Sequence, residues 1–257
     1  MMSDSYVVLG PYLLLAAALL TFVAGFVKGT VGFALPMIMI SGLGSFLAPE
    51  AALGGLIIPA LVTNLWQALR NGLAQAIASV RNHWRYLTIL IVCLAFSAQF
   101  VTRLPENALF LVLGVPVTMF AALQLFGWQL AIDPRNQRRT ELGLGAFAGG
   151  FGGISGVWGP PTVMYLTALQ TPKVEQMRVQ GVVYGAGAVM LTLAHLQSGV
   201  LNTETAILSA TLVLPALLGI AIGFAVQDRL SQEKFRRATL LVLVLGGLNL
   251  IRRGLMG

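Results

Sequence analysis

Long apolar runs separated by short polar segments organise the whole chain. A membrane crossing takes about 20 residues of helix, and six runs have that length: 51–70, 86–102, 107–127, 180–198, 205–226 and 236–251. The runs are continuous and lack the alternation of a barrel strand, so the pattern predicts helices.

Two further apolar stretches are too long for a single transmembrane helix. Residues 11–48 contain one charged residue, Lys28, and residues 142–172 contain none. Glycines and prolines interrupt both stretches near the middle. Each stretch is expected to be either one long crossing or a pair of elements that enters the membrane and returns.

The two interruptions are copies of one another. Residues 25–36 have the sequence GFVKGTVGFALP, and residues 150–161, 125 positions later, have GFGGISGVWGPP. A pair of Gly/Pro-interrupted apolar segments at corresponding places in two halves points to the binding site of a transporter.

Composition supports a membrane protein and argues against a nucleic-acid-binding one. Hydrophobic residues make up 57% of the chain, charged residues 10%, and the mean hydropathy is +0.83. A soluble domain is about a quarter charged. The formal charge of +7 comes from basic residues in short loops, which orient membrane proteins. They are not interleaved with aromatic residues as in a nucleic-acid surface.

Loop charge separates the two topologies. If each interrupted stretch crosses once, the loop Lys and Arg residues divide eight to seven between the two sides; if each returns, they divide twelve to three. Only the second division is a positive-inside pattern. We therefore predict an all-α polytopic fold with an inverted-topology repeat, in which each half has an interrupted Gly/Pro-rich hairpin and three transmembrane helices. Both termini lie outside the cytoplasm, and the hairpin tips meet near the midplane.

The predicted organisation is a single transmembrane domain, 1–257, made of two repeats and a cytoplasmic connection. The first repeat is 1–127, the connection 128–141 and the second repeat 142–257.

The two motifs supply the candidate chemistry. Glycines allow tight turns and close approach of backbone amides to a ligand, and a helix that starts after a break presents N–H groups to an anion. Lys28 is the only Lys or Arg within an interrupted stretch, and an intramembrane cation is a functional candidate. The candidate substrate-binding residues are Lys28, Gly29, Thr30, Gly32, Gly153, Ser155, Gly156, Asn64 and Gln67.

Each candidate has a structural alternative. The motif glycines could serve helix packing, as small residues spaced by four commonly do. Lys28 could extend to the cytoplasmic interface instead of facing a cavity. Asn64 and Gln67, one helical turn apart, could line the cavity or bridge helices.

The absence of acids indicates the charge of the substrate. No Asp or Glu lies within the six predicted crossings or inside the two interrupted stretches. A proton- or sodium-coupled carrier usually keeps a membrane carboxylate. With donors, one lysine and no evident cation ligand, the chain is expected to transport an anion.

At these residues the chain resembles the TauE/SafE family of sulfite exporters and sulfur-organic-anion permeases. The resemblance covers nearly the whole chain and rests on the duplicated Gly-rich, Pro-ended motif. It also rests on QFVTRLP at 99–105 and GFAVQDRLS at 223–231. In its first motif the chain carries Lys28 and fewer glycines than the family pattern. The resemblance implies transport of sulfite, sulfoacetate or related anions without a cofactor.

The function predicted from the sequence is export of a small sulfur-containing anion through the inner cell membrane. Uptake of such an anion, or a membrane scaffold without transport activity, are the alternatives. An enzyme is not expected, because Ser155 has no nucleophile elbow and neither histidine has a neighbour at metal-ligand spacing. The expected partners are the lipid bilayer and the anionic substrate, and a homodimer is an open alternative. Neither a metal nor a nucleic acid is expected to bind.

Overall fold

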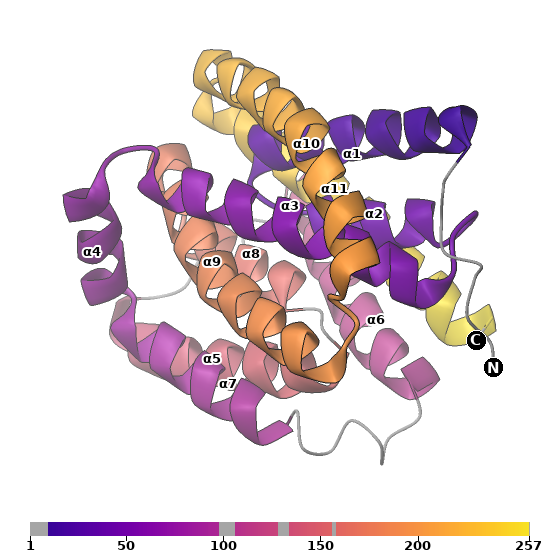
Figure 1. Cartoon of the computed structure of the whole chain (residues 1–257). Helices are drawn as coiled ribbons and strands as arrows, with labels where there is room; N and C mark the ends of the chain where they lie inside the picture. The colour runs from indigo at the N-terminus through magenta and orange to yellow at the C-terminus, as the bar shows by residue number, and fades with distance from the viewer. Residues whose placement is uncertain (1–9, 98–105, 128–133, 156–157, 257) are drawn as a thin grey trace. The chain divides into compact units, whose positions relative to one another are not determined.

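Helices account for all the regular structure in residues 10–97, 106–127, 134–155 and 158–256, which are the residues that the computed structural model describes (Figure 1). Among them, five helices are long and apolar enough to cross a membrane: Pro11–Val31, Ala51–Leu69, Lys173–Gln197, Thr203–Arg229 and Gln232–Met256. The predicted all-α membrane fold is confirmed. The end of the predicted crossing 86–102 and the segment 99–105 lie outside the described residues.

A sequence of long, short and long helices occurs twice. The first set is α1 (Pro11–Val31), α2 (Leu35–Leu43) and α3 (Pro49–Leu69), and the second is α7 (Gln137–Ser155), α8 (Gly159–Ala168) and α9 (Lys173–Ser198). The other elements are α4 (Leu73–Asn82), α5 (Trp84–Ser97), α6 (Glu106–Leu125), a 3₁₀-helix (Pro134–Asn136), α10 (Thr203–Arg229) and α11 (Gln232–Met256). The short helices begin 124 residues apart, nearly the spacing of the sequence motif. The inverted orientation of the repeats stays a prediction.

The chain forms two compact units, each built from both halves of the sequence. Unit 1 is Met1–Arg70 with Gly181–Arg229, and unit 2 is Asn71–Gln180 with Leu230–Gly257. The chain therefore passes from unit 2 to unit 1 inside α9. The repeat boundaries stay predictions, and α7 begins within the predicted connection 128–141.

Glycines in α1 allow it to pack closely on α10 in unit 1. A Cβ atom at Gly25 would lie 2.5 Å from the Ala216 carbonyl oxygen, and one at Gly29 would lie 2.4 Å from that of Ile220. Distances this short exclude any side chain, so both glycines are required for helix packing. Of the two interpretations of the motif glycines, helix packing applies to Gly25 and Gly29, because both lie inside the continuous helix α1 and no turn forms there.

The break in the first hairpin comes after these glycines. Gly32 caps α1 in the left-handed conformation with φ 91°, and Ala34 precedes α2 with φ 79°. Gly32 is the motif glycine that makes the turn. Its lack of a Cβ atom is what makes this conformation accessible.

The first hairpin, α1 followed by α2, ends near the same end of α10 at which it began. Helices α1 and α3 both run along α10 in its own direction, since Gly54 near the start of α3 lies beside Thr205 near the start of α10. Between them α2 runs back, with Gly42 against the side chain of Leu20. Near their ends α1 and α3 meet again, where Gln67 binds the backbone of the turn. The turn thus lies near the last residues of α3 rather than beside its middle.

The second hairpin is built in the same way in unit 2. Helices α5 and α7 run in the same direction, because Gly145 lies against Tyr86 and Gly149 against Leu90. Helix α8 runs back along α7, from contact with Gly152 at its start to a hydrogen bond with Glu141 near its end.

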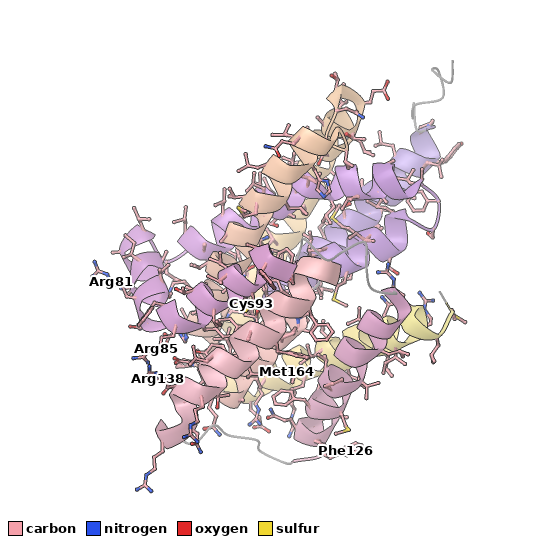
Figure 2. The ribbon with its side chains drawn as sticks, turned by 90° about the horizontal axis from the view of Figure 1, so that it is seen from below. Arg81, Arg85, Cys93, Phe126, Arg138 and Met164 are labelled. Atoms are coloured by element: carbon pink, nitrogen blue, oxygen red, sulfur yellow. The ribbon has the colours of Figure 1, made fainter. Side chains whose placement is uncertain are left out.

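Arginines mark the level to which the second hairpin returns. Figure 2 shows Arg81, Arg85 and Arg138 projecting from neighbouring ends of α4, α5 and α7. Arg178 in α9 lies at the same level, with its Nε 2.6 Å from Ser79 Oγ of α4. A stretch that crossed only once would place Arg178 at the opposite end. Which end faces the cytoplasm stays a prediction.

Candidate functional site

The turn of the first hairpin collects four of the predicted site residues in unit 1. Lys28 lies in the last turn of α1 and is 1% exposed. Its ammonium donates a hydrogen bond to Asn64 Oδ1 of α3. One turn further along α3, Gln67 Nε2 donates to the carbonyl oxygen of Gly32 at 3.0 Å. Asn64 and Gln67 share a helix face because residues three apart are neighbours on a helix.

Tyr184 of α9 completes the surroundings of Lys28, and sequence reasoning did not select it. The Lys28 Nζ lies 5.8 Å from the centroid of the Tyr184 ring, and Asn64 Nδ2 donates to the Tyr184 carbonyl oxygen at 3.4 Å. Gly181 permits this approach, since a Cβ atom there would lie 2.5 Å from the backbone nitrogen of Ala68. The sequence signal is the small-residue pair Gly181 and Gly185, whose spacing of four is typical of helix packing.

Lys28 is a buried cation without an acidic partner in the part of the chain that the structure describes. The ion pairs found in those residues do not include it. Its neighbours are an amide oxygen, an aromatic ring and the carbonyl end of α1, where the helix dipole is negative. An ammonium has three N–H donors and Asn64 takes one of them. A buried charge is costly unless another charge compensates it.

The rest of the first motif contributes less than predicted. The Thr30 hydroxyl donates to the Phe26 carbonyl oxygen at 2.9 Å, so its proton is engaged within α1. The Cα of Gly29 faces α10 rather than a ligand. As substrate contacts, both residues stay predictions.

The second motif lies in unit 2. Gly153 and Ser155 fall in the last turn of α7, and Gly156 lies outside the described residues. Helix α8 begins with Pro160 and Pro161 in its first turn, and proline has no N–H to offer an anion. The amide donors predicted at this break are therefore fewer than at α2. A role for the second motif in binding stays a prediction.

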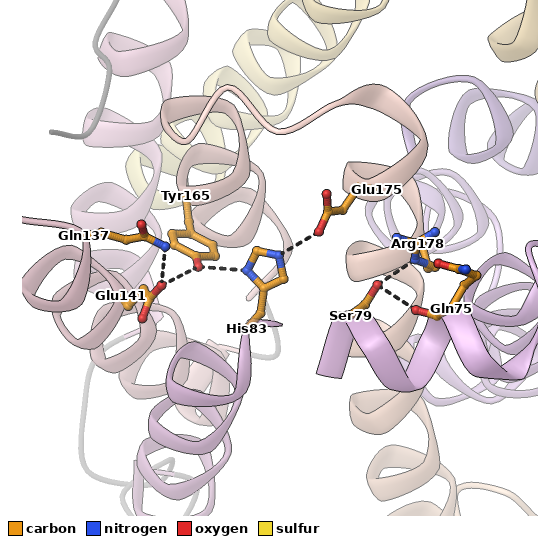
Figure 3. Close-up of polar contacts among 8 residues, drawn as sticks. All are labelled: Gln75, Ser79, His83, Gln137, Glu141, Tyr165, Glu175 and Arg178. Atoms are coloured by element: carbon orange, nitrogen blue, oxygen red, sulfur yellow. Dashed lines mark hydrogen bonds and ion pairs between the residues drawn. The ribbon is translucent and has the colours of Figure 1, made fainter. Parts of the chain in front are cut away.

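A second polar group lies at the base of the second hairpin, and none of its members was predicted (Figure 3). His83, between α4 and α5, has its Nδ1 2.9 Å from the hydroxyl of Tyr165 and its Nε2 3.6 Å from Glu175 Oε1. The Tyr165 hydroxyl donates to Glu141 Oε1 at 3.4 Å. We call His83, Glu141, Tyr165 and Glu175 the His83 cluster. Its sequence signal is that Glu141 and Glu175 delimit a stretch, 142–174, that contains no acidic residue.

The inner members of the His83 cluster are shielded from water. Glu141 is 2% exposed and His83 7%. Burial lowers the pKa of His83 below its usual range; Glu175 and Glu141 oppose this effect, and Arg178 adds to it. His83 is therefore neutral at neutral pH.

No trio of His, Cys, Asp and Glu side chains that could hold a metal ion occurs in the described part of the chain.

Comparison with known proteins identifies one family. The family model described as sulfite exporter TauE/SafE matches residues 17–250 of the 257. No curated protein and no solved structure matches the chain. The matched region contains both hairpins and all five helices that are long enough to span a membrane, apart from the first residues of α1 and the last of α11.

Proposed function

The chain belongs to the TauE/SafE sulfite exporter family and is therefore a multi-pass membrane transporter of sulfur anions; we propose that it exports sulfite or a small organosulfonate from the cytoplasm through the inner cell membrane. One observation carries this proposal. Lys28 is buried at the turn of the first hairpin, and the described residues offer it no carboxylate. An anion at this position would supply the missing charge.

The proposed binding mode uses the donors that remain at the turn. Lys28 has two N–H groups beyond the one that Asn64 accepts. Three residues separate the end of α1 from the start of α2, and α2 has no side-chain cap. Its first N–H groups and its positive dipole end therefore suit an anion. Sulfite and sulfonates present three oxygen acceptors to such donors. Gln67 holds the turn in place through the Gly32 carbonyl.

The direction of transport follows from the membrane potential. A negative interior favours the exit of an anion by about 2.3 kcal/mol per charge per 100 mV. Export can therefore proceed without a driving ion, whereas uptake of the same anion would have to oppose this potential. This difference favours export over uptake.

Flux into proteoliposomes tests the proposal. Labelled sulfite, sulfoacetate and thiosulfate are offered to vesicles that contain the purified protein, with a potassium diffusion potential of either sign. We expect flux of at least one of these anions, faster toward the positive side, and slower flux in vesicles that contain Lys28→Met at the same subsaturating substrate concentration.

Two results would contradict the proposal. Wild-type vesicles that carry none of the three anions above the protein-free background would refute sulfur-anion transport by this chain. Flux that is driven only by an inward sodium gradient, whatever the potential, would make it an importer.

A further inference from the structure

The His83 cluster joins four parts of unit 2 through one chain of polar contacts (Figure 3). Glu175 is in α9, His83 lies between α4 and α5, Tyr165 is in α8 and Glu141 is in α7. The contacts run in that order, at 3.6 Å, 2.9 Å and 3.4 Å.

With a neutral His83, this chain of contacts has one proton fewer than its polar atoms can share. The two ends are carboxylates, which only accept hydrogen bonds when ionised. Two of the contacts are hydrogen bonds, which need one proton each, and the third is an ion-pair contact that favours a proton on Nε2 because a bare nitrogen lone pair would face the Glu175 carboxylate. Three protons therefore satisfy all three contacts. A neutral His83 supplies one and the Tyr165 hydroxyl supplies one. With Nε2–H facing Glu175 and the hydroxyl facing Nδ1, Glu141 loses its hydrogen bond from Tyr165.

One added proton satisfies every contact. A proton from solution binds His83 Nδ1 and forms an N–H bond that points at the Tyr165 oxygen. The Tyr165 hydroxyl is then free to donate to Glu141, and Nε2–H still faces the Glu175 carboxylate. The imidazolium then interacts with the Glu175 carboxylate directly and with the Glu141 carboxylate through the Tyr165 hydroxyl.

Charged neighbours of both signs act on the cluster, so the protonated and the neutral form of His83 stay close in free energy. Glu141 also accepts from Gln137 Nε2 at 2.9 Å and lies 3.6 Å from Arg85 Nη1. Arg178 of α9 binds Ser79 of α4 and lowers the pKa of His83, while Glu175 and Glu141 raise it. The Arg85 side chain is 45% exposed and that of Glu175 is 30% exposed, so water reaches the cluster from its edges. A proton can enter without an opening of the fold.

The positions in unit 1 that correspond to Glu141, Tyr165 and His83 are apolar. Shifted by 124 to 126 residues, the positions of Glu141, Tyr165 and His83 fall on or next to the buried residues Ala17, Met39 and Leu208. Those residues pack between α1, α2, α3 and α10 as a hydrophobic core. Glu175 has an acidic counterpart in the sequence, Glu50, which lies 125 positions earlier. A hairpin of this architecture therefore forms without a histidine, a tyrosine or an inner acid at its base, and packing does not explain these three members of the His83 cluster.

We propose that the His83 cluster is a proton-binding site and that its occupancy controls the rate of transport; the second part rests on the proposed function. Protonation ties α7, α8 and α9 to the α4–α5 junction, and loss of the proton releases the contact between Tyr165 and Glu141. The ligand is a single proton, exchanged with the solution at the base of the second hairpin.

The first test measures the proton directly and does not depend on transport. The chain has two histidines, so His195→Gln leaves one imidazole, whose nitrogen-15 NMR signals are followed from about pH 5 to pH 8, the range in which imidazoles titrate. We expect a pKa below that of a free histidine and an Nε2–H tautomer at neutral pH. Glu175→Gln should lower this pKa and Arg178→Gln should raise it. A signal with the pKa of a free histidine, unmoved by both variants, would overturn the proposal.

The second test measures control of transport. Flux of methanesulfonate, which stays ionised in this pH range, is recorded in proteoliposomes between about pH 5 and pH 8. The wild-type rate should change with the slope of one proton, up to about tenfold per pH unit, and His83→Gln and Tyr165→Phe should flatten the profile. The second variant keeps the ring that stacks on Tyr86, 4.2 Å away, so it guards against misfolding.

Histidine 195 supplies the matched control, and the outcomes separate the two proposals. His195→Gln should keep the wild-type profile. A wild-type profile in both His83→Gln and Tyr165→Phe would overturn control by the cluster while leaving sulfur-anion transport intact. If wild-type vesicles carry neither methanesulfonate nor any of sulfite, sulfoacetate and thiosulfate, the proposed function and the control of transport are both refuted, and the NMR titration still decides whether the cluster binds a proton.

Discussion

At the scale of single residues, the charge of Lys28 carries the first prediction. Lys28→Met keeps an unbranched chain of similar length in the buried position but removes the ammonium. If the anion binds there, the loss should cost about 1–3 kcal/mol, or about 5- to 150-fold in apparent affinity. Lys28→Arg should restore part of the affinity because the charge stays while the shape changes. Initial rates against substrate concentration in proteoliposomes measure both effects.

The control for this prediction is an exposed lysine. Lys234 lies on the surface of α11, and Lys234→Met should leave the apparent affinity unchanged. An apparent affinity equal to wild type in well-expressed Lys28→Met would remove the lysine from the site and leave binding to backbone amides.

His83 predicts how stability depends on pH. Its pKa in the folded protein is lowered, mainly by burial, so the unfolded chain takes up the proton first as the pH falls. The stability that a neutral His83 provides is thus complete above about pH 6.5, the value for a free imidazole, and is lost as the pH falls through the lowered pKa. Thermal unfolding in detergent from about pH 8 to pH 5 should show wild type losing more stability than His83→Gln. Parallel curves for the two proteins would contradict this.

Sequence reasoning found the buried cation but missed the buried acid, for a physical reason. Lys28 stands alone in an apolar stretch, so its cost in the membrane is visible in the sequence. Glu141 borders an apolar stretch, where an acid normally faces water. Its burial depends on contacts with α5 and α8, and sequence spacing carries no information about those contacts.

At the scale of elements, two neighbouring glycines of α7 should respond oppositely to the same substitution. A Cβ atom at Gly149 would lie 2.2 Å from the Leu90 carbonyl oxygen, whereas one at Gly150 would have nothing within 4 Å. Gly149→Ala should push α7 from α5 and destabilise by about 1–3 kcal/mol. Gly150→Ala should stabilise by up to about 1 kcal/mol, because alanine is the better helix former. Melting temperatures of the two purified variants test this pair, and equal shifts would contradict the α5–α7 packing.

The existence of the hairpins could be predicted, but the position of the break could not. Repeated Gly and Pro residues between apolar runs indicated an interruption in each half. The backbone continues as a helix through Gly25 and Gly29 because α10 covers that face, and a helix satisfies its own hydrogen bonds in an apolar surrounding. A glycine that permits a turn and one that permits packing look the same in sequence.

At the scale of the whole molecule, the return of both hairpins predicts where polar segments emerge. In a Cys93→Ser background, which removes the single native cysteine, new cysteines are introduced one at a time and labelled with an impermeant reagent. Those at Arg81, Arg138 and Arg236 should react only from the cytoplasm, and those at Asn107, Thr203 and Gly257 only from outside. Labelling of the Arg81 and Arg236 positions from opposite faces would restore an eight-span topology.

The assignment of helices to units could not be predicted from the sequence. Stripes of glycine at 25 and 29 and at 219 and 223 indicated close packing in each helix, and the structure pairs these two stripes with one another. Periodicity identifies the face of a helix that packs, but not its partner. The sequence therefore predicted two halves, while the compact units exchange segments between them.

This exchange of segments imposes an order on biosynthesis. Helix α1 is synthesised long before α10, and α6 long before α11. The glycine face of α1 therefore enters the bilayer before α10, the helix on which it packs, has been translated. Neither unit is complete until synthesis passes residue 229. A chain that stops earlier exposes unpaired helix faces and becomes a substrate for membrane proteases. The two halves, expressed as separate polypeptides, should be degraded alone and survive when they are made together, because each supplies the helices that the other lacks.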